Sequence, residues 1–292
     1  MKEKLRKFMT VAMAIGFIVG GLILVYPLIA NVWNQHRNDM LFVEYTENNL
    51  SDLSDESLKD EWEKAIEYNN NLEPIIIPDS FVQAQNNYNP NDGYMSCLNI
   101  DNDGIMGFIS IPRIDVKLPI GHTTDNEVLE KYVGHIHGSS LPIGGVSNHA
   151  VLSAHRGLPN ASLFTDLDLL EKGDQFYLYV LDEILAYEVD DIRVVEPSNT
   201  AGLEIIEGED LVSLVTCTPY GVNSHRLIVR GHRVEYSPEK EMEQASNQAN
   251  SNHTNYILWI AIGVLITAPV LIIVAVISGR KKNKSDKVRE DE

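Results

Sequence analysis

The stretch Leu211–Gly221, which reads LVSLVTCTPYG, decides how this chain folds. An apolar run from Leu211 to Thr216 is typical of a buried strand, and it ends on a cysteine followed by a Pro/Gly turn. A strand that delivers a lone thiol to a turn places a nucleophile where binding and catalytic groups commonly lie. Cys217 is therefore the first candidate catalytic residue.

Short runs rich in Val, Ile and Tyr surround this stretch, with Gly, Pro and Asn turns between them. They predict strands at 105–111, 116–120, 150–154, 175–181, 185–195, 211–216 and 227–234. Short helical stretches are expected near 126–132 and 161–170. The pattern predicts a mostly β fold, either an antiparallel-leaning barrel or a sandwich.

Two more reactive side chains lie at the ends of predicted strands. His155 follows the apolar strand Val151–Ala154, and Arg226 immediately precedes Leu227. If these strands are neighbours of the one that carries Cys217, the three side chains converge at one rim of the sheet. A thiol needs help to react near neutral pH, and a guanidinium suits developing negative charge because it stays protonated.

Two motifs that resemble metal sites are incomplete. His135 and His137 share one face of a strand, but no third ligand is evident, so we interpret them as a polar face. The segment Asn99–Gly104 resembles the start of a calcium loop, but Ser110 stands where the glutamate at the twelfth position belongs. A turn before the first strand is the better interpretation. We expect no metal and no cofactor.

The 292 residues carry a formal charge of −19, unevenly distributed. Two runs without a charged side chain, 8–30 and 256–278, are long enough to cross a bilayer as helices. Residues 1–7 carry four basic and one acidic side chain, and residues 279–292 carry six basic and four acidic ones. The region between them holds 13 basic and 37 acidic residues, so we do not expect it to bind nucleic acid.

The basic flanks predict that both termini lie in the cytoplasm and the acidic region outside a two-pass cell-membrane anchor, with the lipid bilayer as a partner. A cleaved signal peptide is the alternative for 8–30, but the run is long and Tyr26–Leu28 offers no clear cleavage site. In an extracellular domain Cys97 and Cys217 could form a disulfide, although Cys97 lies in a polar stretch that resembles a linker.

The remaining segments follow from composition. Apolar residues at helical spacing, from Leu58 to Ile66, predict a helical region over 31–72, and Pro and Asn then interrupt the pattern. We expect the order basic cytoplasmic end (1–7), transmembrane helix (8–30), helical N-terminal segment (31–72), irregular segment (73–95), catalytic barrel (96–236), polar flexible stalk (237–255), transmembrane helix (256–278) and basic cytoplasmic tail (279–292).

Three segments resemble sortases, specifically the pilus-building class C type. Residues 213–227, SLVTCTPYGVNSHRL, resemble the motif Thr-Leu-x-Thr-Cys with an arginine nine residues after the cysteine, although Ser213 stands in place of the first threonine. Residues 152–159, LSAHRGLP, resemble the segment of the catalytic histidine, and residues 104–112, GIMGFISIP, the first barrel strand. The resemblance covers about 57–235 and implies a closed eight-stranded β-barrel of the sortase type.

By this resemblance the chain is a cysteine transpeptidase on a Gram-positive type of cell surface. Cys217 would attack the Thr-Gly bond of an LPxTG-like sorting signal, His155 would protonate the departing amine, and Arg226 would bind the oxyanion or the substrate backbone. The partners would be LPxTG-bearing pilins or surface proteins, and a pilin lysine would accept the acyl group. His225 alternates to the opposite strand face and is expected to be a bystander.

Class C sortases also carry a lid with an Asp-Pro-Phe/Trp motif, and the matching place here is Asp79-Ser80-Phe81. The resemblance implies that the segment 73–95 is this lid, in which Asp79 pairs with Arg226 and Phe81 covers Cys217. Serine in place of proline at position 80 loosens the backbone and would weaken closure. A plain linker is the alternative.

Two other functions stay open. The same chemistry could attach surface proteins to a cell-wall peptide amine, although the lid and the second apolar run favour pilus assembly. The domain could also be an inactive, membrane-anchored binding module. The intact Cys217, His155 and Arg226 count against that function, and thiol labelling of Cys217 would distinguish the two.

Overall fold

The computed structural model describes residues 2–50, 53–72, 79, 81, 93–158, 161–248, 262–263 and 267. The chain forms two compact units, one of residues 26–249 and one of residues 1–25 with 250–292. The helical elements are α1 (Lys2–Val43), a π-helix (Glu44–Asn49), α3 (Asp55–Asn70), α4 (Asn126–Leu129), α5 (Pro238–Ser246) and short 3-10 turns at Tyr94–Ser96, Pro112–Ile114 and Leu167–Leu169.

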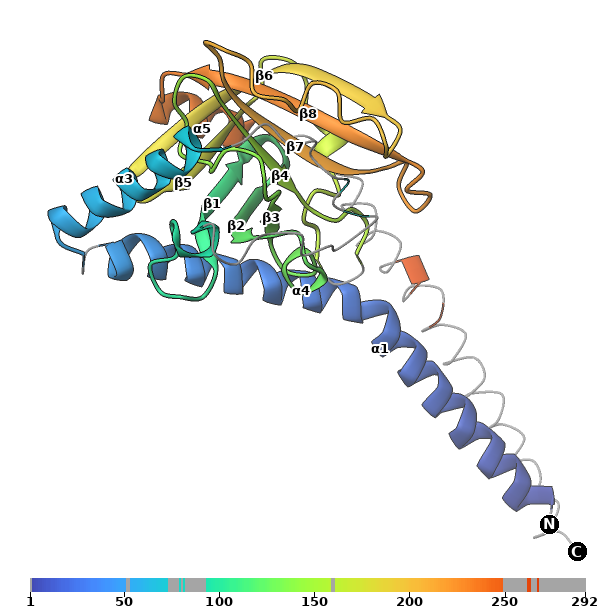
Figure 1. Ribbon diagram of the computed structural model, residues 1–292. Helices are drawn as coiled ribbons and strands as arrows, with labels where there is room; N and C mark the ends of the chain where they lie inside the picture. The colour runs from blue at the N-terminus through green and yellow to red at the C-terminus, as the bar shows by residue number, and fades with distance from the viewer. Residues whose placement is uncertain are drawn as a thin grey trace, which may run out of the picture. The chain divides into compact units, whose positions relative to one another are not determined.

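Eight strands close into a barrel in the order β1-β2-β3-β4-β7-β8-β6-β5 (Figure 1). Their bounds are β1 Ile105–Ile111, β2 Val116–His122, β3 Val133–His135, β4 Asn148–Ser153, β5 Gln175–Val180, β6 Glu183–Val195, β7 Asp210–Thr218 and β8 His225–Val234. The β2–β3 and β4–β7 pairs are parallel and the other pairs are antiparallel. The expected closed eight-stranded barrel with short helices is confirmed.

The apolar run at 8–30 lies within α1, whereas most of the run at 256–278 lies outside the described residues. Within the described part of the chain, no helix combines the length and the apolar character needed to cross a membrane. The two membrane spans stay predictions.

Strand β7 is buried on both faces, which explains why apolar side chains occur on both of its faces. Val212 and Leu214 belong to the main core of the barrel, whereas Val215 belongs to a second, smaller apolar cluster. Because side chains alternate along a strand, Cys217 lies on the same face as Val215 and Ser213. Cys217 is thus on the face of the second cluster, which we call the outer face.

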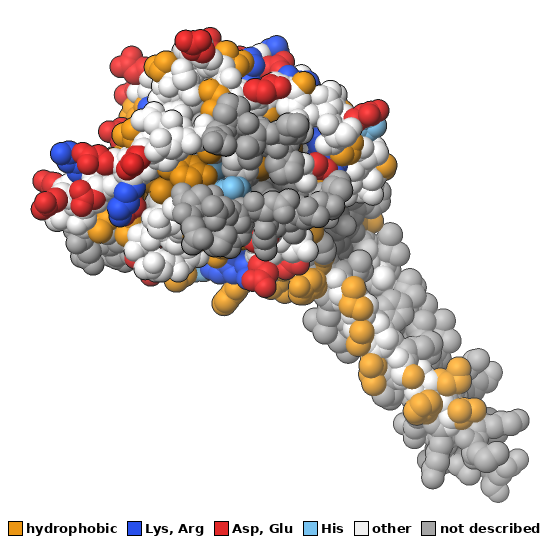
Figure 2. Space-filling view, in the orientation of Figure 1, with side chains coloured by type: hydrophobic (Ala, Val, Ile, Leu, Met, Phe, Trp, Pro, Cys, Tyr) orange, Lys and Arg blue, Asp and Glu red, His pale blue; other side chains and the backbone are white. Residues whose placement is uncertain are grey.

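The helix α3 packs on the main core through one apolar side. Ser54 caps its N-terminus by accepting a hydrogen bond from the Ser57 amide at 3.1 Å, and Ala65 is fully buried. Trp62 donates to a carboxylate oxygen of Asp182 at 2.9 Å. Acidic side chains gather over this helix on the surface, as Figure 2 shows, in agreement with the acidic composition.

Two segments differ from the expectation. The polar stretch expected to be a flexible stalk begins with helix α5, because Ser237 caps it, Pro238 occupies its first turn, and Tyr179 and Tyr236 donate to Glu241 at 2.7 and 2.9 Å. Cys97 lies in the main core with 4% of its surface exposed rather than in a linker. The two cysteines are present as thiols, not as a disulfide.

Candidate active site

Three adjacent strands bring the predicted reactive side chains to one rim of the barrel. Because β4 and β7 run parallel, with Ser153 opposite Val215, their carboxyl ends meet. The amide of Ala154 donates to the Val215 carbonyl at 3.2 Å, so His155 follows at the level where β7 carries Cys217. Strand β8 runs antiparallel to β7 and places Arg226 directly opposite Cys217.

Arg226 is held by an aspartate from far away in the chain. Its Nε and Nη2 atoms donate to the two carboxylate oxygens of Asp79 at 2.8 and 2.7 Å. Only 7% of the Arg226 side chain and 11% of the Asp79 side chain are exposed. Its Nη1 donates to the backbone oxygens of Asn223 and His225 at 3.1 and 3.0 Å. Such a bidentate, buried pair is among the stronger hydrogen-bonded contacts in proteins.

Phe81 covers the same place. Its ring lies 5.1 Å from the Arg226 guanidinium and 5.5 Å from the His155 ring, and it packs against the second apolar cluster. The amide of Phe81 also faces a carboxylate oxygen of Asp79 at 3.4 Å. Of the segment 73–95, only these two residues and 93–95 are described, so Ser80 lies outside the described residues.

The surroundings shift the pKa of both Cys217 and His155. Burial raises the pKa of the Cys217 thiol; Arg226 lowers it and Asp79 raises it. Burial lowers the pKa of His155, partly offset by Glu130. Burial therefore favours the neutral form of each group, the protonated thiol and the uncharged imidazole.

One site neighbour escaped the sequence analysis. Arg156, next to His155, is 8% exposed; its Nη1 donates to the Thr218 hydroxyl at 3.2 Å and its Nη2 pairs with Asp168 at 2.5 Å. Arg156 therefore connects the segment that carries His155 to Thr218, the residue after Cys217. Its position beside the histidine was the only signal in the sequence.

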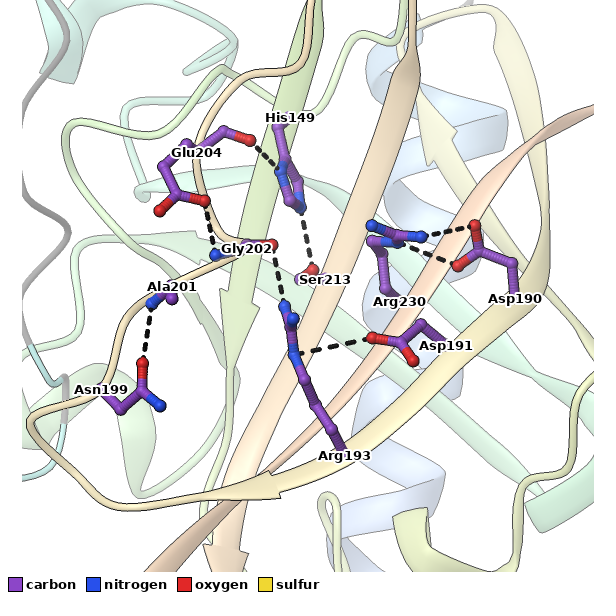
Figure 3. Close-up of polar contacts among 10 residues, drawn as sticks. All are labelled: His149, Asp190, Asp191, Arg193, Asn199, Ala201, Gly202, Glu204, Ser213 and Arg230. Carbon is purple, nitrogen blue, oxygen red and sulfur yellow. Dashed lines mark hydrogen bonds and ion pairs between the residues drawn. The ribbon is translucent and has the colours of Figure 1, made fainter.

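A second polar region, also missed, lies along the outer face beyond the second apolar cluster (Figure 3). Arg230 on β8 donates twice to Asp190 on β6, at 2.9 Å each. His149 on β4 lies between the backbone oxygen of Glu204 and the Ser213 hydroxyl, at 2.8 Å from each. The sequence did hold a signal for two of these residues. Arg230 and Ser213 lie an even number of residues from Arg226 and Cys217, which places them on the same strand faces.

The other candidate motifs form structural contacts. His135 is fully buried, with Nε2 at 2.8 Å from the Ser140 carbonyl and Nδ1 at 2.9 Å from the Tyr94 hydroxyl. His137 packs edge-on against the same tyrosine ring. Among the described residues, no three His, Cys, Asp or Glu side chains are placed to hold a metal ion.

The segment 99–104 is the expected turn, since the Asn99 side chain accepts from the Gly104 amide at 2.9 Å. His225 is exposed, and its Nδ1 lies 2.9 Å from the Ser224 hydroxyl. The contact that His225 makes with Arg226 is through its backbone oxygen, at 3.0 Å from Nη1.

Comparisons with known proteins agree with these motifs. A family model described as a Sortase domain matches residues 109–234. The crystal structure of sortase C-1 from Actinomyces oris is 48% identical with a TM-score of 0.60, and the match covers 62% of this chain and 99% of that one. The structure of Streptococcus pneumoniae sortase C, reported to bear on pilin substrate specificity, is 41% identical with a TM-score of 0.62. That match covers 68% of this chain and 99% of that one.

The curated relatives match over a shorter part of their length. Sortase D of Bacillus subtilis (strain 168) is 34% identical over 131 residues, which are 44% of this chain and 63% of that protein. The chain thus spans less than two thirds of that relative. The resemblance carried by the three motifs is confirmed.

Proposed function

Because the chain belongs to the sortase family, we propose that it is a membrane-anchored cysteine transpeptidase that polymerises pili. The observation that carries the proposal is the pairing of Cys217 with Arg226 across β7 and β8, beside His155 and beneath Phe81. A thiol, an imidazole and a fixed guanidinium at one rim are the groups that acyl transfer needs. The similarity to sortase C structures supports a pilin as the substrate.

The proposed reaction begins when Phe81 and Asp79 leave the site. The Cys217 thiol gives its proton to His155, and the thiolate attacks the threonine carbonyl of an LPxTG-like signal. The guanidinium of Arg226, no longer paired, donates hydrogen bonds to the oxyanion. His155 then protonates the glycine amine, the C–N bond breaks, and a thioester remains on Cys217.

A pilin lysine completes the cycle in this proposal. Its neutral amine attacks the thioester, an isopeptide bond forms, and the amine proton returns by way of His155 to the leaving thiolate of Cys217. The enzyme ends with the same number of protons with which it began. No metal or cofactor enters this sequence of steps.

Residues Asp79 and Phe81 act as a lid in this proposal. Asp79 accepts from the Nε and Nη2 atoms of Arg226 and keeps a negative charge near Cys217, which raises the pKa of the thiol. Phe81 occupies the apolar surface beside His155. A substrate therefore has to replace an aspartate and an aromatic ring, and it binds only in proportion to the open fraction.

The proposal is tested with an LPxTG-like peptide. Cys217→Ala should abolish both cleavage and formation of a thioester adduct, measured by mass spectrometry, because no other group can carry the acyl chain. Cys97→Ala should retain both, since Cys97 lies in the core. Equal losses in the two variants would contradict the assignment of Cys217.

The acceptor and the anchoring need separate tests. Offered a lysine-bearing pilin segment and a cell-wall peptide amine together, the thioester should transfer to lysine; transfer to the peptide amine would support surface-protein attachment instead. For anchoring, protease added to protoplasts should remove residues 31–255 and spare tags at both termini. Digestion of the C-terminal tag would exclude two spans.

A further inference from the structure

The connection between β6 and β7 places one apolar side chain on the outer face. Leu203 is 5% exposed and belongs to the second apolar cluster, together with Ile136, Val151, Val215 and Ile228. The other members lie on strands or directly after one, where the barrel backbone holds them. Leu203 comes from a loop, so other contacts have to hold it in place.

Two side chains of the barrel wall hold the backbone on either side of Leu203 (Figure 3). Arg193 on β6 donates from Nη2 to the Gly202 carbonyl at 2.9 Å. His149 on β4 donates from Nδ1 to the Glu204 carbonyl at 2.8 Å. The leucine is thus bracketed by two hydrogen bonds from two different strands.

Position 202 is adapted to this approach. Gly202 has a φ of +82°, and a Cβ there would lie 2.4 Å from the guanidinium nitrogens of Arg193. A side chain at position 202 would strain this backbone conformation and displace the Arg193 guanidinium. Glycine therefore permits the contact between Arg193 and the loop.

The orientation of His149 is also determined. A carbonyl oxygen only accepts, so Nδ1 carries the proton toward Glu204, and Nε2 accepts from the Ser213 hydroxyl at 2.8 Å. The ring is buried, and burial lowers its pKa; the hydrogen bond to the Glu204 carbonyl partly offsets this, and the charges of Arg230 and Arg193 lower the pKa further. Both ring nitrogens are satisfied in the neutral state.

The second apolar cluster connects Leu203 with the residues proposed for catalysis. Phe81, which covers Arg226 and His155, packs on the same cluster as Leu203. A peptide that displaces Phe81 meets that apolar surface. We propose that His149 and Arg193 are positioning residues that hold Leu203 as a wall of the substrate site and thereby determine substrate affinity; this rests on the proposed function.

The expected kinetic signature is a change in KM alone. No contact joins either residue to Cys217 among the described contacts, so the chemical step should be unaffected once the peptide is bound. Losing one hydrogen bond shifts the loop toward states in which Leu203 leaves the cluster. We expect KM to rise about fivefold in each variant, with kcat changed less than about twofold.

The experiment uses the full chain and an LPxTG-like peptide. His149→Leu and Arg193→Met should show the higher KM. His149→Asn keeps a donor near the Nδ1 position, so its KM should stay close to that of the wild type. The matched control is His232→Asn, a partly exposed histidine on β8.

Coupling and local exchange distinguish a wall from a general loss of structure. Leu203→Ala should raise KM by itself and combine non-additively with His149→Leu, because both remove the same wall. Hydrogen exchange of the Leu203 amide should be faster in His149→Leu while the barrel strands keep wild-type exchange. If His149→Leu does not fold, the Arg193→Met and Leu203→Ala pair supplies the same test.

The outcomes are separable from those of the proposed function. Two results would overturn the proposal that His149 and Arg193 position Leu203. One is a wild-type KM in both variants of an active enzyme, and the other is a lower kcat in these variants. An inactive wild-type enzyme would instead overturn the transpeptidase proposal, and the exchange measurement would still decide whether His149 holds the loop.

Discussion

Two arginines on β8, Arg226 and Arg230, make the same contact with partners of different origin. Each guanidinium donates two hydrogen bonds to one aspartate. Asp190, the partner of Arg230, lies on the neighbouring strand β6, 40 positions away. Asp79, the partner of Arg226, lies 147 positions away and outside the barrel strands.

This difference decides what each pair can do. The sheet hydrogen bonds between β6 and β8 hold the backbone on either side of Asp190, so Asp190 stays beside Arg230 as long as the barrel is folded. Asp79 is held by no strand, and its pair can break while the barrel stays folded. Because a buried guanidinium without a partner is unfavourable, an oxygen of a bound peptide would have to replace Asp79. In the proposed mechanism, the Asp190 pair is structural and the Asp79 pair is the one that opens.

The largest expected effect comes from making one substitution at both arginines. Arg226→Met should lower kcat/KM for an LPxTG-like peptide by about 100-fold or more, since it removes the donors proposed for the oxyanion. Arg230→Met should change kcat/KM by less than about fivefold, because Arg230 lies beyond the apolar cluster. Steady-state kinetics measures both, and similar losses would show that the two pairs do not differ in function.

Replacing Asp79 by alanine should increase the reactivity of Cys217, whereas replacing Asp190 should not. Asp79→Ala, alone or with Phe81→Ala, should accelerate alkylation of Cys217 by about tenfold, the gain expected if the lid is closed about 90% of the time. Asp190→Ala should leave the rate as in wild type. Equal rates in all variants would mean that Asp79 and Phe81 belong to a linker rather than a lid.

The pH dependence of alkylation should change as well. In the wild type, burial and Asp79 raise the pKa of the Cys217 thiol while Arg226 lowers it, so reaction should increase above the ordinary thiol range of about 8.5. In Asp79→Ala the negative charge is gone and Arg226 is unpaired, so both effects lower the pKa. The midpoint of the rate profile should therefore move to lower pH; a midpoint that stays in place would exclude this coupling.

The smallest effect concerns stability. Asp190→Ala should lower the free energy of unfolding by about 1 kcal/mol, or roughly 2–4 °C in the melting temperature, because it breaks a partly buried pair within the sheet. Asp79→Ala should lower it by at most about 1.4 kcal/mol, the free energy that corresponds to a lid closed about 90% of the time. Calorimetry of the two variants checks both values, and a loss well above about 1.4 kcal/mol for Asp79→Ala would mean that Asp79 is held as firmly as the barrel itself.

The sequence predicted local features well. The strand at 105–111 has the expected bounds, and Cys217, His155 and Arg226 lie at one rim of the barrel as their strand ends predicted; their catalytic roles stay predictions. The three-residue strand β3 was missed because so short a segment shows no periodicity. Helix α5 was missed because its polar composition hides the Ser237 cap and the contacts that Glu241 makes with distant tyrosines.

What the sequence by itself determined about this protein are the properties that depend on neighbouring residues. These are the alternation of the strands, the turn after Cys217, the acidic charge of the central region and the family to which the motifs point. Only the tertiary structure decided that Arg156 reaches Thr218, that Asp190 holds Arg230, and that His149 holds the loop at Glu204. The physical reason is that these contacts join residues between 40 and 62 positions apart, and barrel closure, not local spacing, brings them together.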